Sequence, residues 1–132
     1  MASTQVQIWR SSDFNIEREE GKAPGAVIFR LFGPFTARDM FSSLTPFALS
    51  EIFKTSRHSE WTGMHILDLT GVPYMDSTGL GSIARQYRKC KAEGIRLIAV
   101  GAGARVLQRF KTSKLDILIP MASTVEEAEN RA

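Results

Sequence analysis

Four short runs of apolar residues along the chain have the length and composition of β-strands. AVIFRLF at 26–32 is rich in β-branched and aromatic residues, and Gly33-Pro34 ends it. HILDL at 65–69, IRLIAV at 95–100 and LDILI at 115–119 have the same character. We therefore expect four strands whose side chains are mostly buried.

The N-terminal part carries a weaker pattern of alternating positions. Two pairs of apolar residues, Val6 with Ile8 and Phe14 with Ile16, alternate with polar residues. This alternation is typical of half-buried strands, so one or two edge strands are expected here.

After the first long apolar run, the spacing of apolar residues changes to the period of an α-helix. Thr36 can cap such a helix, and Asp39 falls in its first turn. Pro46 interrupts it, because proline is costly in a helix interior, yet Thr45 followed by Pro46 can start a second segment. The pattern predicts a broken or kinked helix, followed by a polar loop at 55–63.

The C-terminal half contains three further helical patterns. Apolar positions within 80–90 and 104–111 recur at helical spacing, and basic residues occupy the other faces of the first. A hydroxyl residue, Ser123 or Thr124, stands three positions before a glutamate, which is the arrangement of a capping box. We expect a short final helix after it.

Strands that alternate with helices at short spacing favour an α/β fold. The order of elements predicts a central mixed, largely parallel sheet of about five strands, flanked by about four helices. A chain of 132 residues is long enough for one such domain and too short for two with separate cores. We assign 1–12 to an N-terminal extension or edge strand and 13–132 to the domain.

The composition excludes several classes of protein. Apolar residues make up 43% and charged residues 23% of the chain, which is typical of a globular protein. No apolar stretch reaches the roughly 18 residues of a membrane-spanning helix, and the N-terminus lacks a secretory signal pattern, so we expect a cytoplasmic protein. Cys90 is the single cysteine, and His58 and His65 have no ligand-like neighbours. Neither a disulfide, a metal nor another cofactor is therefore expected.

Charge is distributed unevenly along the chain. The segment 85–114 contains nine basic residues and one acid, a net charge of +8, whereas the remainder holds 8 basic and 13 acidic residues, a net charge of −5. Amphipathic helices commonly expose Lys and Arg to water, and the alternative is a surface for an anionic partner. Aromatic residues are not interleaved with the charges and no groove-reading motif occurs, so a protein partner is favoured over nucleic acid.

The segment 68–83, DLTGVPYMDSTGLGSI, is more specific than its apolar pattern. Here a strand, a loop and the start of a helix meet around Asp76-Ser77-Thr78. A hydroxyl in the first turn of a helix lies near backbone N–H groups without intrahelical acceptors, where phosphate is stabilised. Gly79 and Gly81 leave room for a partner, although each glycine costs a helix roughly 0.5–1 kcal/mol relative to Ala. The simpler alternative is that Asp76, Ser77 or Thr78 is merely an N-cap.

This segment resembles the signature of the STAS domain, the family of bacterial anti-sigma-factor antagonists, which carries an Asp-Ser-Ser-Gly-Leu-Gly-like loop at the start of a helix. The resemblance extends from about Ala26 to about Glu129 in element order, and it is strongest over 67–100. In that family the hydroxyl residue directly before the first glycine is phosphorylated by a kinase-like anti-sigma factor. The resemblance places this modification at Thr78, with Ser77 as the alternative, although most members known for sigma regulation have Ser at the Thr78 position.

The resemblance implies a phosphorylation-regulated binding module without catalytic residues. The unmodified protein would bind a serine/threonine-kinase-type anti-sigma factor and free the sigma factor, thereby regulating transcription. Phosphorylation would end the binding, and a phosphatase would restore it. The residues expected to contact the partner are Asp76, Ser77, Thr78, Gly79, Leu80, Gly81 and Arg85. We expect no contact with nucleic acid or membrane, and a monomer or weak dimer.

Two other classes of function stay open. The same domain could be a constitutive interaction subunit of a stress-signalling scaffold or of a lipid or anion transport assembly, with Thr78 unmodified. An enzyme that uses Asp76 and Thr78 is less favoured, because no base, metal or cofactor motif accompanies them. The turn at 101–103 lacks the third glycine of a dinucleotide loop, and no glycine-rich phosphate loop is followed by a lysine.

Overall fold

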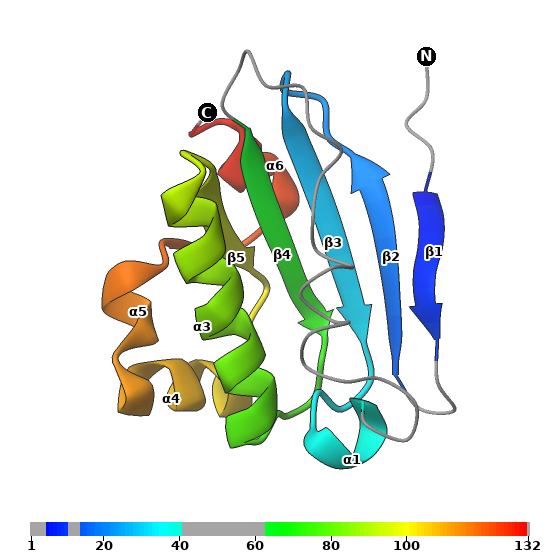
Figure 1. The fold of residues 1–132 in the computed structure, drawn as a ribbon, viewed down its shortest axis with the longest axis vertical. Helices are drawn as coiled ribbons and strands as arrows, with labels where there is room; N and C mark the ends of the chain where they lie inside the picture. Colours follow the sequence, from blue (N-terminus) through cyan, green and yellow to red (C-terminus); the bar gives the residue numbers. More distant parts are fainter. Residues whose placement is uncertain (1–4, 11–13, 41–62, 132) are drawn as a thin grey trace.

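The fold is built on a mixed β-sheet, which a computed structural model shows in Figure 1. The structure describes residues 5–10, 14–40 and 63–131. In these ranges the sheet has six strands, in the order β1-β2-β3-β4-β5-β6. Their bounds are β1 Gln5–Arg10, β2 Asn15–Glu20, β3 Ala26–Phe32, β4 Met64–Gly71, β5 Arg96–Val100 and β6 Met121–Ala122. Strands β1 to β3 pair antiparallel and strands β3 to β6 pair parallel, so the expected mixed, largely parallel α/β sheet is confirmed.

The helices described are α1 Ala37–Met40, α3 Ser77–Ala92, α4 Ala104–Ser113, α5 Leu115–Leu118 and α6 Val125–Glu129. The capping box predicted for the last of them is present. Thr124 Oγ1 accepts the N–H of Glu127 at 3.1 Å, and the Glu127 carboxylate accepts the N–H of Ser123 at 2.8 Å. None of the helices in the described ranges is long and apolar enough to cross a membrane.

Alternation along the parallel strands directs apolar side chains to both faces of the sheet. Phe29 and Leu67 point to one face, where they pack with the buried side chains of α3, α4 and α5. Ile28 and Ile66 point to the opposite face and pack with Ala128 of α6. In Figure 1, α3 accordingly lies in front of the sheet and α6 lies behind it.

The prediction of a strand at 115–119 is wrong, because this segment begins with the short helix α5. Leu115 and Ile119 are 6% and 0% exposed, whereas Ile117 between them is 75% exposed. Burial at positions four apart is the helical period; a strand would have buried Ile117 with its alternate neighbours. Lys114 adopts a left-handed conformation, with φ of 65°, between α4 and α5. The strand of this region is β6, which follows α5.

Part of the predicted pattern falls on 41–62, outside the described residues. This applies to the interruption at Pro46, to the second helical segment that it would start, and to most of the polar loop. Helix α1 is described, and it begins at Ala37, directly after Thr36.

Candidate functional site

The motif singled out from the sequence lies at the carboxyl end of β4, where the β4–α3 loop meets the β3–α1 loop. The Phe35 N–H donates to the Tyr74 carbonyl at 3.0 Å, and the Asp76 N–H donates to the Phe35 carbonyl at 3.4 Å. Phe35 and Met75 form a parallel β-bridge, and both side chains are buried. The Phe35 ring also stacks on Phe14, with centroids 5.0 Å apart. The start of α3 is therefore held against buried aromatic residues and paired backbone.

A single carboxylate, that of Asp76, bonds to the starts of two helices. Its Oδ1 accepts the N–H groups of Thr78 and Gly79, each at 3.0 Å, which makes Asp76 the N-cap of α3. Its Oδ2 accepts the N–H of Ala37, the first residue of α1, at 3.0 Å. A negative charge is favourable at these positive helix ends. The N-cap alternative thus describes Asp76, so the hydroxyls of Ser77 and Thr78 are not needed for capping.

Ser77 and Thr78 are the first two residues of α3. Ser77 is exposed and Thr78 is half-buried. The sequence predicts unpaired N–H groups here, but Asp76 already accepts two of them. A phosphate on Thr78 would meet the positive end of the helix and also the nearby carboxylate, and these effects oppose each other. We therefore expect a charge at Thr78 to change the local surface more than the stability of the fold.

The two glycines of the motif have different surroundings. A Cβ on Gly79 would lie 2.1 Å from the backbone carbonyl oxygen of Phe35, so the packing of α3 against the β3–α1 loop requires a glycine there. A Cβ on Gly81 would have no neighbouring atom within 4 Å. The packing gives no reason for a glycine at 81, and a side chain there would project into open space beside Thr78.

The other predicted contact residues lie farther along α3. Leu80 is half-buried and packs against the main core, so it contributes to the fold as well as to the surface. Arg85 is exposed, seven residues after Thr78. That spacing is two helical turns, or about 10 Å along the axis, and it places both residues on one face of the helix.

Two pairs of tyrosine and cation were not found from the sequence, one beside the motif and one in the C-terminal half of α3. The Arg105 guanidinium, at the start of α4, lies 4.8 Å from the ring centroid of Tyr74 in the β4–α3 loop. The Lys91 ammonium lies 5.9 Å from the ring centroid of Tyr87 on α3. The first contact joins residues far apart in the chain. A signal for this contact is present in the order of elements. The carboxyl ends of neighbouring parallel strands meet at one edge of a sheet, so the segments that follow β4 and β5 are expected to lie close together.

Comparison with known proteins agrees with this geometry. Residues 18–128 match the family model described as the STAS domain. The chain belongs to the STAS domain family. This confirms the resemblance seen in the sequence, and it covers the sheet from the middle of β2 onward together with the whole Asp76–Gly81 motif.

Several solved structures share the fold of this STAS domain. An anti-sigma factor antagonist from Mycobacterium paratuberculosis is 21% identical, with a TM-score of 0.67 over 93% of this chain and 97% of that one. The Bacillus protein SpoIIAA is 24% identical in its unphosphorylated form, with a TM-score of 0.64 over 89% and 94%, and 23% identical in its phosphorylated form, with 0.60 over 89% and 97%. A sulfate transporter family protein from Wolinella succinogenes is 18% identical, with 0.66 over 84% and 88%. At these identities the likeness concerns the fold.

Beneath α3, the STAS domain contains a buried polar cluster. His65 on β4 is 2% exposed; its Nδ1 lies 2.8 Å from Gln86 Nε2 and 3.4 Å from Cys90 Sγ. Burial lowers the pKa of His65 from 6.5 to about 4, and the charge of Arg18 adds to this effect. Burial likewise raises the pKa of the Cys90 thiol to about 12, so the thiol stays protonated. Within the described ranges no three His, Cys, Asp or Glu residues could together hold a metal ion.

The shifted pKa of His65 predicts a loss of stability in mild acid. As the pH falls from 6.5 to 4, the unfolded chain takes up a proton on this imidazole and the native protein does not. The free energy of unfolding should therefore fall by about 3 kcal/mol from this group across that range. His65→Asn, which does not titrate, should flatten this part of the profile in urea melts at stepped pH. Equal slopes for the variant and the wild type would contradict the assignment.

Proposed function

We propose that this STAS domain is an anti-sigma factor antagonist that acts as a phosphorylation-regulated binding module and not as an enzyme. Its unmodified form binds a kinase-type anti-sigma factor through the Asp76–Gly81 motif and Arg85, and the sigma factor is released. Phosphorylation of Thr78 ends the binding, and a phosphatase restores it. The observation that carries this proposal is the placement of Thr78 in the first turn of α3, partly exposed, where Asp76 already performs the capping.

The physical basis of the switch is charge at a contact surface. A phosphate adds about −1.5 to −2 charges, which must be desolvated or repelled when a partner covers the loop. A larger side chain at position 81 would not disturb the fold, but it would obstruct this surface. The glycine there therefore supports the close approach of a partner. Thr78 is half-buried, so part of its surface is open to the bound kinase.

The comparisons support the proposal at the level of the fold. SpoIIAA has been solved in both an unphosphorylated and a phosphorylated form, and both share the fold of this chain. A domain of this architecture can therefore carry a phosphate without unfolding. Extending this property to Thr78 is our inference from the motif.

The first test is phosphopeptide mapping after incubation of the protein with ATP and a kinase-type anti-sigma factor from the same host. We expect phosphate on Thr78, although Ser77 is the more exposed hydroxyl, because Thr78 stands directly before Gly79. Ser77→Ala should still be modified, and Thr78→Ala should not. Phosphate confined to Ser77 would refute the assigned position.

A second candidate function is supported by the likeness to a sulfate transporter family protein. In that alternative the domain is a constitutive subunit of a transport assembly, and Thr78 remains unmodified. Capture of partners from the host extract distinguishes the two functions. A kinase released by phosphorylation of the bait supports the antagonist, whereas a membrane transporter retained equally by wild type and Thr78→Glu supports the alternative.

A further inference from the structure

Helices α3 and α4 carry many cations and no carboxylate. Their basic residues are Arg85, Arg88, Lys89 and Lys91 on α3, and Arg105, Arg109 and Lys111 on α4. All but the half-buried Lys89 are exposed. Ion pairs between described residues occur elsewhere, at Arg30 with Glu19 and Asp68 and at Arg131 with Glu127, and none uses a cation of these two helices. The charge on α3 and α4 is thus uncompensated by carboxylates in the described ranges.

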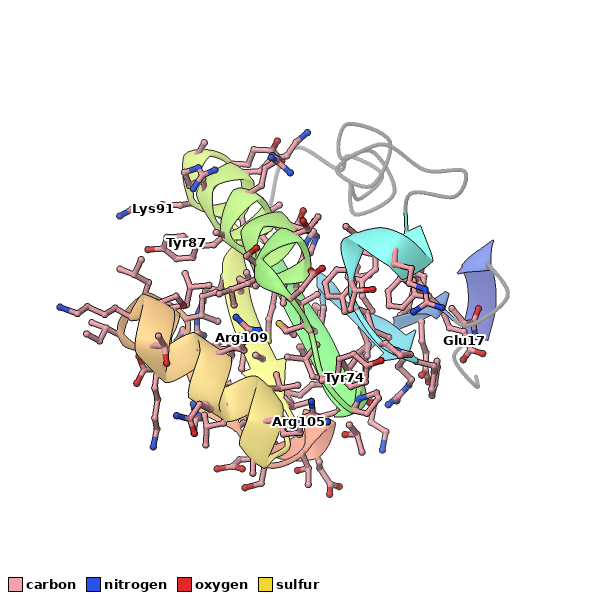
Figure 2. The ribbon with its side chains drawn as sticks, turned by 90° about the horizontal axis from the view of Figure 1, so that it is seen from below. Glu17, Tyr74, Tyr87, Lys91, Arg105 and Arg109 are labelled. Atoms are coloured by element: carbon pink, nitrogen blue, oxygen red, sulfur yellow. The ribbon has the colours of Figure 1, made fainter. Side chains whose placement is uncertain are left out.

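The two helices pack on the same face of the sheet, and Figure 1 shows α4 running crosswise at the lower, N-terminal end of α3. Seen from below in Figure 2, Arg109 on α4 lies between the pair of Tyr74 and Arg105 and the pair of Tyr87 and Lys91, which belongs to the C-terminal half of α3. We call these five residues the α3–α4 seam. It is a row of cations in which the outer two lie against tyrosine rings.

The tyrosines indicate which kind of anion the seam fits. A cation held over an aromatic ring is positioned before binding, which favours recognition of an anion. Nucleic-acid bases instead need free aromatic faces on which to stack. Here Arg105 covers a face of Tyr74 and Lys91 lies over Tyr87, so these faces serve the cations of the chain itself.

We propose that the α3–α4 seam binds an acidic segment of a protein partner. The complementary charge is that of Asp and Glu side chains, and the matching segment is extended from the start of α4 to the C-terminal half of α3. This surface does not depend on phosphorylation of Thr78, and it stands or fails separately from the proposed function.

The test uses a 12-residue oligoglutamate peptide as the probe and the ¹⁵N-labelled full chain at low salt. Titration should produce saturable amide shifts that map to the seam. Arg109→Glu should weaken binding by roughly five- to tenfold. The matched control is Lys22→Glu, which makes the same change of charge at an exposed turn before β3 and should bind the peptide nearly as wild type does. Tyr74→Leu keeps the net charge and should weaken binding of the peptide, because the Arg105 guanidinium loses the ring that positions it.

Four results would contradict the proposal, provided that thermal melts show each variant folded. Amide shifts that map away from the seam would reject the site. Equal weakening of peptide binding by Arg109→Glu and Lys22→Glu would show that only the net charge of the protein matters. Tighter binding of a dT12 oligonucleotide than of the peptide would assign the surface to nucleic acid. Unchanged affinity in Tyr74→Leu would reject the role of the Tyr74–Arg105 pair.

Discussion

Gly79→Ala is expected to destabilise the domain by about 2–4 kcal/mol, since overpacking against atoms that cannot move is among the costlier single changes. The new Cβ would lie 2.1 Å from the Phe35 carbonyl oxygen, and that oxygen also accepts the N–H of Asp76. Relief requires α3 to move away from the β3–α1 loop, which would also strain the bond from Ala37 to Asp76. Urea denaturation followed by circular dichroism measures the effect.

Gly81→Ala is the matched control, because it is the same change two residues later in the same helix. Its Cβ would meet open space, so the gain in helix propensity should raise stability by about 0.5–1 kcal/mol. The proposed function adds that this variant binds the anti-sigma factor more weakly although it is more stable. If the two alanine variants unfolded at the same urea concentration, the structural distinction between the glycines would be wrong.

Thr78→Glu is expected to weaken binding of the anti-sigma factor at least a hundredfold while leaving the domain folded. Asp76 rather than Thr78 caps α3, so no cap is lost. The favourable interaction of the new charge with the helix end, worth roughly 0.3–1 kcal/mol, is opposed by repulsion from the Asp76 carboxylate. Stability should therefore change by less than about 1 kcal/mol. Calorimetric titration and a denaturant melt of the same preparation separate binding from folding.

Two variants control this experiment. Thr78→Ala should bind like the wild type, and its binding should no longer respond to ATP. Thr112→Glu makes the same substitution at an exposed position near the end of α4 and should leave binding close to wild type. Wild-type affinity in Thr78→Glu, or a loss of affinity explained by unfolding, would contradict the charge switch.

The features that the sequence predicted correctly depend on local pattern. The runs at 26–32, 65–69 and 95–100 are strands because apolar, β-branched stretches of that length fit a buried sheet. The start of α3 was placed to within two residues, because Asp, Ser and Thr before an apolar helical period are a local signal. The family followed from the motif that these elements flank.

The features that the sequence did not predict depend on contacts between distant segments. A five-residue apolar run such as 115–119 is compatible with both a helix and a strand. The position of the core favours a helix, in which Ile117 is exposed. The difference between Gly79 and Gly81 arises from the Phe35 carbonyl oxygen on another loop. The second bond of Asp76, to Ala37, likewise joins segments that only the parallel sheet brings together.

The central claim is that a single phosphate on Thr78 turns off partner binding in a domain that stays folded. The most direct measurement is calorimetric titration of one anti-sigma factor with the unmodified protein and with the protein phosphorylated by that kinase to completion. We expect saturable binding of the unmodified form and an affinity at least a hundredfold lower for the phosphorylated form, with superimposable circular dichroism spectra. Equal affinities of the two forms would contradict the account.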